Sequence, residues 1–308
     1  MTTDGMLQVA AQHYEMKLEQ AKLLKGYSNQ IYECGDKIFQ FTAKQYKSSE
    51  EIGMELAWMN FLRSKGVNVA EVISSKRGKT FEELENGLLV CYRKINGKKI
   101  SRSLWSAQHV QQLGKLTGQL HRWGKVFQAS TSFSIKHWHE IPKAKIEADL
   151  PKDERKLPQL HEHLKHQFHA YPINTEAYGL IHYDIHHGNY LIAKEQKIVL
   201  FDFEMACQSW YAHEIGTVLY YALFLPMMQA KKEADKWFLK HFLKGYSKEH
   251  TIAPQELDKI PAYLLYRDLL VYAYISKVWS EENITEAQEV FREQIEQGIL
   301  ERRECLGL

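Results

Sequence analysis

The sequence of 308 residues lacks several features that define large classes of protein. It has only four cysteines, and they are scattered: Cys34, Cys91, Cys207 and Cys305. Without a C-x-x-C pair they indicate neither a disulfide framework nor a zinc site. The 40 lysines and arginines nearly balance the 38 aspartates and glutamates, which excludes the basic excess typical of a nucleic-acid-binding protein. Because no signal peptide pattern precedes the cysteines, we expect a cytoplasmic protein.

Long apolar runs are also missing. The most apolar stretch, residues 263–279, is interrupted by Arg267, Asp268 and Lys277. Crossing a bilayer would bury these three charges, so we expect a core helix and no membrane partner. The composition, with 44% hydrophobic and 25% charged residues, is that of an ordinary globular protein. A chain of this length most naturally forms two lobes.

What the sequence does contain is a dense group of polar residues near its middle. The group is His182, Asp184, His186, Asn189, Asp202 and Glu204. Apolar runs at 180–181, 190–192 and 198–201 separate these residues, with 194–197 as a turn, and their β-branched and aromatic content predicts short buried strands. We therefore expect polar side chains at strand ends beside a core.

This set of residues suits phosphoryl transfer. The reaction needs an acidic side chain to orient and deprotonate a hydroxyl, and oxygen ligands to hold Mg²⁺ against the phosphates of ATP. Asp184 and Asn189 have the D-x-x-x-x-N spacing of a kinase catalytic loop, and Asp202 begins Asp-Phe-Glu where protein kinases have Asp-Phe-Gly. Capping and turn roles could explain any one of these residues, but all of them in this order favour a site.

His182-Tyr-Asp-Ile-His-His-Gly-Asn189 and Phe201-Asp-Phe-Glu204 resemble the aminoglycoside phosphotransferase and choline kinase family. The resemblance implies an α+β, two-lobed protein-kinase-like fold. A nucleotide-binding lobe with a small antiparallel sheet and one helix would span residues 1–95, and a mostly α-helical catalytic and acceptor lobe would span 96–308. It also implies that Asp184 is the base and that Asn189 and Asp202 bind metal.

Further roles around this loop follow from the same resemblance. Glu204 would act through a metal-bound water or meet a cationic acceptor, and His182 and His186 would brace the loop. In the first lobe, Ser28 and Asn29 would lie over the phosphates, since the chain has no G-x-G-x-x-G loop. Backbone groups of a hinge that includes Arg93 and Ile95 would pair with the adenine edge.

The first lobe is predicted to contain five strands, at 22–25, 30–34, 37–42, 67–73 and 88–92. A capping box at Ser48 and Glu51 starts a helix that ends at Lys65-Gly66. Glu55 on this helix is either solvated or the kinase glutamate that pairs with a strand lysine; the similarity of Gly53-Met-Glu-Leu-Ala-Trp58 to the family's G-E-L-x-W favours the second.

The third strand departs from the family pattern. Gln40 stands where the family has a lysine or arginine. Strand alternation gives Lys37 to the other face, and Lys44 lies four residues further on, so no basic neighbour replaces Gln40 within the strand. We predict weak ATP binding and slow turnover, with Glu55 unpaired or held by another base, because a neutral amide binds phosphate less strongly than a charged group.

The sequence after residue 100 predicts helices at about 110–123, 209–225, 230–247, 254–279 and 285–304. Pro226 should end the second of these helices. His121, at a helix end, is expected to be structural. A metal site at His163 and His166 lacks further ligands at suitable spacing, so the histidines of residues 128–172 are expected on solvated helix faces. The tyrosines around Arg267 indicate either a packed core or an acceptor-pocket wall, with the core favoured.

We therefore predict an ATP- and Mg²⁺-dependent phosphotransferase that phosphorylates a hydroxyl of a small metabolite. An amino alcohol, amino acid, sugar or aminoglycoside would fit as acceptor, and no nucleic acid is needed. One alternative is a nucleotide-binding pseudoenzyme with a regulatory role, which the Gln40 departure favours. The other is a protein Ser/Thr kinase, which the absence of a Gly-rich loop and of an A-P-E segment disfavours.

Overall fold

The computed structural model describes residues 3–15, 17–24, 29–100, 105–141, 146, 149–153, 155–223, 231–279 and 284–308. The chain forms two compact units. The first unit comprises residues 1–105, 126–134 and 187–204, and the second unit comprises 106–125, 135–186 and 205–308. The division of the chain into two functional lobes at residues 95 and 96 stays a prediction. The first compact unit differs from the predicted first lobe in that it also includes residues 187–204.

The first unit contains an antiparallel five-stranded sheet in the order β1-β2-β3-β5-β4. Its strands are β1 (Lys22–Leu24), β2 (Gln30–Cys34), β3 (Lys37–Ala43), β4 (Phe81–Glu83) and β5 (Gly87–Arg93). The predicted β1-β2-β3 meander is confirmed. The prediction of a strand at 67–73 is wrong, because this segment divides its pairing: the N–H of Ala70 donates to Leu200 and that of Ile73 donates to Cys91.

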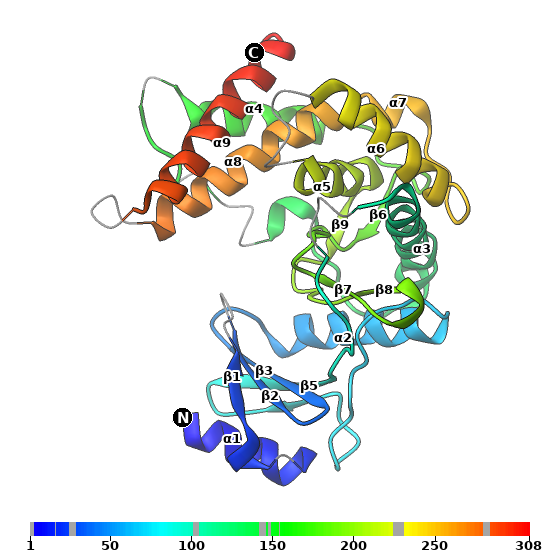
Figure 1. Ribbon diagram of the computed structural model, residues 1–308, viewed down its shortest axis with the longest axis vertical. Helices are drawn as coiled ribbons and strands as arrows, with labels where there is room; N and C mark the ends of the chain where they lie inside the picture. The colour runs from blue at the N-terminus through cyan, green and yellow to red at the C-terminus, as the bar shows by residue number, and fades with distance from the viewer. Residues whose placement is uncertain are drawn as a thin grey trace. The chain divides into compact units, whose positions relative to one another are not determined.

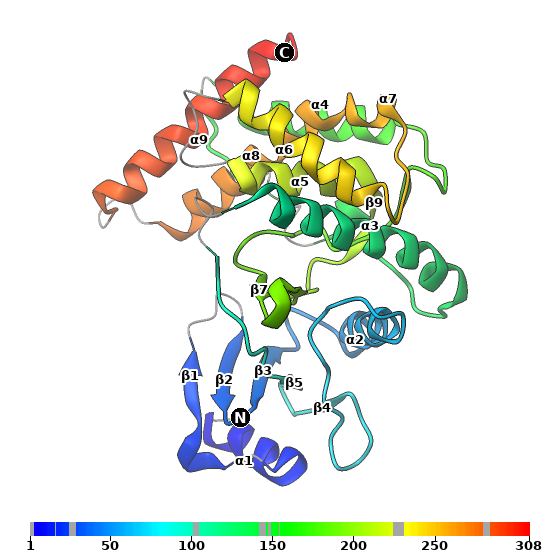
Figure 2. The ribbon, with the colours of Figure 1, turned by 45° about the vertical axis from the view of Figure 1, so that its right-hand side comes forward.

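Two helices cover the two faces of this sheet, α1 (Thr3–Tyr14) and α2 (Ser49–Ser64), as Figures 1 and 2 show. Phe39 and Phe41 of β3 are buried in a cluster that includes Tyr14 of α1. The alternation of β3 therefore turns Gln40 to the opposite face, as predicted. The capping box of Ser48 and Glu51 at the start of α2 is confirmed. A short 3₁₀ turn, Leu18–Gln20, precedes β1.

A hairpin of β7 (Tyr190–Ile192) and β8 (Ile198–Leu200), joined by the 3₁₀ turn Lys194–Gln196, completes the first unit. The segment after β5 pairs with it, since Lys98 and Ile192 exchange two backbone hydrogen bonds of 2.9 Å. A Cβ on Gly97 would lie 2.9 Å from the carbonyl oxygen of Ile192. Glycine at position 97 thus allows the close approach of this segment to β7.

The second unit is mostly α-helical around the two-stranded sheet of β6 (Tyr178–Ile181) and β9 (Cys207–Trp210). Its helices are α3 (Ala107–Ser130), whose end from residue 126 belongs to the first unit, α4 (Leu157–His169), α5 (Tyr211–Leu223), α6 (Lys231–Tyr246), α7 (Pro254–Leu257), α8 (Ile260–Val278) and α9 (Glu286–Cys305), with a 3₁₀ turn at Trp138–Glu140. The single helix predicted at 254–279 is two, because Pro261 is tolerated only in a first turn. Pro226 lies outside the described residues.

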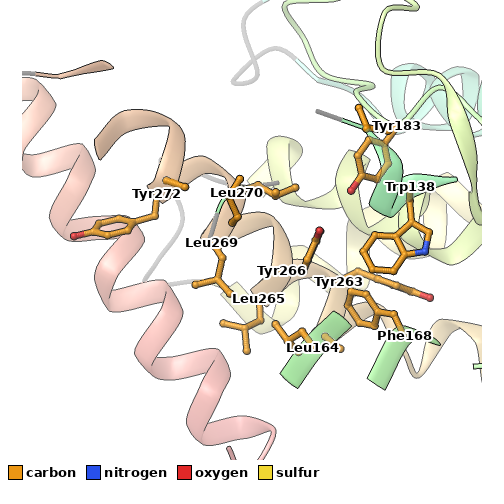
Figure 3. Close-up of a cluster of buried hydrophobic side chains, with 14 of the residues drawn as sticks. Trp138, Leu164, Phe168, Tyr183, Tyr263, Leu265, Tyr266, Leu269, Leu270 and Tyr272 are labelled. Carbon is orange, nitrogen blue, oxygen red and sulfur yellow. The ribbon is translucent and has the colours of Figure 1, made fainter. Parts of the chain in front are cut away.

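The core of the second unit is rich in aromatic side chains, as Figure 3 shows. Trp138, Phe168 and Tyr266 are at most 1% exposed and pack with their ring centroids 5.3–5.6 Å apart. Tyr263 and Tyr266 belong to this cluster, so the core interpretation of α8 is confirmed for them. The expectation of solvated histidines is wrong for His161, which is fully buried against Tyr266.

The sequence predicts neither a membrane-spanning helix nor a disulfide framework. None of the helices in the described ranges has the length and apolar character needed to cross a bilayer. All four cysteines are free thiols, three of them buried and Cys305 exposed.

Candidate active site

The loop that follows β6 carries three of the predicted site residues in the second unit. His182 is fully buried, and its Nδ1 accepts a hydrogen bond of 3.3 Å from the backbone N–H of Asp184. Tyr183, between them, has a φ of 70°, a conformation that a bulky residue adopts only when its surroundings hold it. Nε2 of His186 lies 3.5 Å from the Asp184 carboxylate. This geometry agrees with the predicted bracing role of both histidines.

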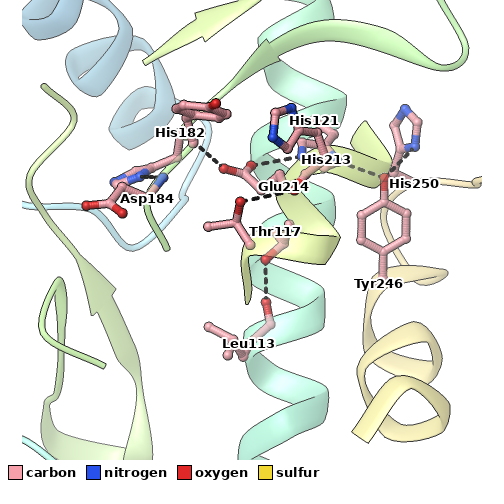
Figure 4. Close-up of polar contacts among 11 residues, drawn as sticks. Leu113, Thr117, His121, His182, Asp184, His213, Glu214, Tyr246 and His250 are labelled. Carbon is pink, nitrogen blue, oxygen red and sulfur yellow. Dashed lines mark hydrogen bonds and ion pairs between the residues drawn. The ribbon is translucent and has the colours of Figure 1, made fainter. Parts of the chain in front are cut away.

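A buried network of hydrogen bonds holds the turn at Tyr183 in place (Figure 4). The N–H of Tyr183 donates to Oε1 of Glu214 at 2.6 Å, and Oε2 of Glu214 lies 2.9 Å from Nε2 of His121. Nδ1 of His121 is 2.7 Å from the hydroxyl of Tyr246. Both ring nitrogens of His121 therefore have partners, which confirms its structural interpretation. Burial raises the pKa of Glu214 and lowers that of His121, so burial disfavours the charged form of both groups.

Asp184 itself stays ionised. Burial would raise its pKa, but the hydrogen bond and charge of His186, together with the charge of Arg267, outweigh burial and hold the pKa below its ordinary value. Nη1 of Arg267 lies 3.7 Å from the Asp184 carboxylate. The carboxylate is 23% exposed, so it is accessible to a ligand.

In the first unit, Asn189 and Asp202 flank one end of the β7–β8 hairpin. Tyr190 pairs with Leu200, and the N–H of Phe201 donates to the carbonyl of Asn189 at 2.9 Å. Asn189 is buried, whereas Asp202 is exposed with a φ of 66°. The backbone pairing thus places Asn189 and Asp202 at the same end of the hairpin.

Three carboxylates of the first unit act electrostatically on Tyr92. Burial raises the pKa of Tyr92, and the charges of Glu55, Asp202 and Glu204 raise it further. The Nδ2 group of Asn29 donates to Glu204 at 3.3 Å. The structure therefore joins the predicted site residues Asn29 and Glu204 directly, while Ser28 lies outside the described residues.

Glu55 is paired with a lysine that the sequence analysis did not consider. Its side chain is 3% exposed and forms an ion pair with Lys47, which is 13% exposed. Gln40 instead donates to the hydroxyl of Thr42 at 3.4 Å. Of the two predicted outcomes, Glu55 unpaired or held by another base, the second is confirmed, because Lys47 reaches Glu55 from beyond the end of β3, where strand alternation no longer applies.

The predicted hinge residues lie at a pocket on the first unit. The N–H of Arg93 already donates to the carbonyl of Glu71 at 2.8 Å, and the carbonyl of Ile95 accepts from Gly97 at 3.0 Å. Both side chains line a cavity of about 360 Å³ that also includes Glu71 and Lys194. Because Asn29, Glu55 and Asp202 are absent from its lining, this cavity does not identify an adenine site.

The residues present fit a divalent metal ion. The Oδ1 atom of Asn29 is buried without a hydrogen-bond partner among the described residues, and it belongs to the amide that contacts Glu204. Amide and carboxylate oxygens are the ligands that Mg²⁺ accepts, and Mg²⁺ usually keeps several waters as well. In the described part of the chain no three His, Cys, Asp or Glu side chains form a group that could hold a metal ion by themselves.

No role in the site was predicted from the sequence for Lys47, Glu214 or Arg267. Lys47 could have been found by extending the search for a base beyond the end of the strand. Arg267 had one signal: it is a charged residue within the most apolar helix, where a buried charge needs a partner.

Comparison with known proteins agrees with this geometry. Residues 19–252 match the phosphotransferase enzyme family. Amicoumacin kinase of Bacillus subtilis (strain 168) is 30% identical over 311 residues, which cover 96% of this chain and 92% of that protein. An amicoumacin kinase solved in complex with AMP-PNP, Ca²⁺ and Ami has a TM-score of 0.89 and 30% identity, covering 96% of this chain and 94% of that one. A microcompartment-associated aminopropanol kinase has a TM-score of 0.77, 20% identity, and coverage of 99% and 98%.

The fold and the site together define a kinase that acts on small molecules, and the predicted α+β protein-kinase-like fold is confirmed. The chain belongs to the phosphotransferase enzyme family. It is an enzyme that transfers a phosphoryl group from ATP, with a divalent metal ion, to a hydroxyl group of a small molecule. The activity and cofactors predicted from the sequence are confirmed at this level.

Proposed function

We propose that Asp184 orients the hydroxyl of the acceptor and takes up its proton as the acceptor oxygen bonds to the γ-phosphorus. The bond between that phosphorus and the bridging oxygen breaks, so the products are the phosphorylated acceptor and ADP. The observation that carries this assignment is the ionised, partly exposed carboxylate of Asp184, fixed by His182 and His186. Positioning of this kind is the main task in phosphoryl transfer, because the transition state needs little covalent help.

In the first unit, Asn189 and Asp202 would hold Mg²⁺, and Glu204 with Asn29 would support it through water. The place of Asn189 and Asp202 at the hairpin end and the hydrogen bond between Asn29 and Glu204 support this role. Bound Mg²⁺ and ATP would supply the transferable phosphate with its charge partly neutralised. Lys47 adds a positive charge next to Glu55, which the kinase chemistry requires for phosphate binding.

The acceptor that we propose is amicoumacin or a compound of its class. The similarity to amicoumacin kinases extends over 96% of this chain and more than nine-tenths of theirs, so it includes the helical second unit as well as the nucleotide-binding part. The aminopropanol kinase shares the fold at lower identity and supports no choice of acceptor.

An acceptor panel tests this proposal. The purified protein would be incubated with ATP, Mg²⁺ and either amicoumacin, aminopropanol, choline, homoserine or spectinomycin, and phosphorylated products would be measured by mass spectrometry. We expect the highest kcat/KM with amicoumacin. A protein that phosphorylates another member of the panel but leaves amicoumacin unchanged would contradict the choice of acceptor.

Two further points complete the proposed function. The alternative of a regulatory pseudoenzyme depended on the absence of a basic residue at position 40 of the third strand. Lys47 provides a basic side chain that pairs with Glu55 instead. We also propose that the enzyme works in the cytoplasm, where ATP is available; its free cysteines agree with a reducing compartment.

A further inference from the structure

Arg267 is a buried arginine of α8 that contacts the loop of Asp184 at two points. Its Nη2 donates to the carbonyl of Tyr183 at 2.6 Å, and its Nη1 lies 3.7 Å from the Asp184 carboxylate. Nη2 also donates to the hydroxyl of Thr217 on α5 at 2.9 Å. Arg267 is 4% exposed, and all of these partners lie in the second unit.

Two aromatic rings fix the plane of the guanidinium. The central carbon lies 4.9 Å from the ring centroid of Tyr183 and 5.7 Å from that of Tyr221. This geometry favours arginine over lysine, since only a planar group can donate in a fork and lie over a ring at once. The position of the cation relative to Asp184 is therefore set by packing.

Holding α8 against the Asp184 loop and α5 does not by itself explain a buried arginine at this position. Its Nε is buried and has no hydrogen-bond partner among the described residues. A buried charge with an unsatisfied donor is costly, and well-packed apolar residues often hold helices together as well or better. Such a cost is expected where a charge serves a reaction.

We propose that Arg267 is a positioning residue for phosphoryl transfer. It holds the Tyr183 turn in place through its hydrogen bond to the Tyr183 carbonyl and its contact with Thr217, so that the Asp184 carboxylate is oriented to accept a hydrogen bond from the acceptor hydroxyl. This inference rests on the proposed role of Asp184 in catalysis.

The charged and titratable groups that face Asp184 determine how its pKa should respond to a change at Arg267. His182 and His186 face it from its own loop with Tyr183, Arg267 faces it from α8, and Tyr221 faces it from α5 near His186. Burial acts to raise the pKa of Asp184, and the positive groups act to lower it. Removing the charge of Arg267 while His186 remains should therefore raise this pKa, and the acid limb of the rate should move to higher pH with it.

The experiment compares three variants of the full chain. Arg267→Gln removes the charge but can still donate to the Tyr183 carbonyl, Arg267→Lys keeps the charge, and Thr217→Val is a matched control that removes only the contact with α5. The first readout is the titration of the Asp184 carboxyl by carbon NMR without ATP or acceptor. The second is kcat against pH with amicoumacin, ATP and Mg²⁺.

We expect Arg267→Gln to raise the Asp184 pKa, to lower kcat by about 10²-fold, as for loss of positioned proton transfer, and to leave the KM for ATP within about twofold. Arg267→Lys should keep the pKa low and recover part of kcat. Thr217→Val should change neither the pKa nor the pH profile.

An unchanged Asp184 titration in Arg267→Gln, or the same loss of kcat in Thr217→Val, would overturn the proposal in favour of a purely structural arginine. If Arg267→Gln does not fold, the wild-type titration decides: an Asp184 pKa at or above its ordinary value overturns it. If the wild type phosphorylates no acceptor, the proposed function fails, while the titration still reports on Arg267.

Discussion

Lys47 and Glu55 form an almost fully buried ion pair in the first unit, although Lys47 lies beyond the end of β3 and Glu55 lies on α2. The family pattern places the base on the strand, where this chain has Gln40. The pair shows that a lysine from the following turn can meet the helix glutamate. We therefore withdraw the prediction of weak ATP binding based on Gln40 alone.

The first prediction tests this relocated lysine. Lys47→Ala should weaken ATP binding by roughly 10- to 100-fold, because a hydrogen bond to a charged group contributes about 1.5–3 kcal/mol. Adding Gln40→Lys to Lys47→Ala should restore much of the affinity, since it returns the base to the strand. Calorimetric titration with Mg²⁺ and ATP measures both effects.

Lys44→Ala is the matched control, because Lys44 is exposed and contacts only Glu83 at 3.6 Å among the ion pairs described. It should bind ATP like the wild type. Equal affinities for Lys47→Ala and Lys44→Ala would remove Lys47 from the nucleotide site.

The second prediction concerns Asp202 at the hairpin end. Asp202→Ala should lose most of the Mg²⁺-dependent part of ATP affinity, because the phosphates then keep more of their charge uncompensated. Calorimetry with and without Mg²⁺ separates this part from direct nucleotide binding. If Mg²⁺ improves ATP binding equally in both proteins, Asp202 does not hold the metal.

The third prediction uses the pH dependence of stability. Burial raises the pKa of Glu214 to about 7. As pH rises from about 4.5 to 7, the unfolded chain releases this proton while the folded chain keeps it, so Glu214 lowers the free energy of unfolding across this window and has no further effect above it. The loss should be at most about 3.5 kcal/mol, since the shift of about 2.5 pKa units corresponds to about 1.4 kcal/mol per unit.

Urea denaturation of the wild type and Glu214→Gln at pH 5, 6 and 7 measures this loss. His121, whose pKa is lowered, contributes the opposite slope below its ordinary value, but it does so in both proteins. We expect the stability of the wild type relative to Glu214→Gln to decrease with rising pH. A constant difference would show that Glu214 is ionised in the folded protein throughout.

The local elements of the site could be predicted from the sequence, since they depend on neighbours in the chain. The strands around residues 180, 191 and 199, the capping box at Ser48 and the loop spacing of Asp184 and Asn189 all follow from alternation, caps and motif order. The Lys47–Glu55 and Asp184–Arg267 pairs could not, because turn geometry and helix packing decide which distant charges meet. His161 shows the same limit: its burial depends on α4 packing against Tyr266.

The most direct test of the central claim follows the γ-phosphate of labelled ATP into amicoumacin, with wild type and Asp184→Asn side by side. The substitution removes the proton acceptor but keeps the shape of the side chain, so folding and Mg²⁺-ATP affinity should change little, as circular dichroism and calorimetry would check. The account predicts labelled amicoumacin from the wild type, at a rate about 10²–10⁴ times that of Asp184→Asn. Equal rates of labelling by the two proteins would contradict it.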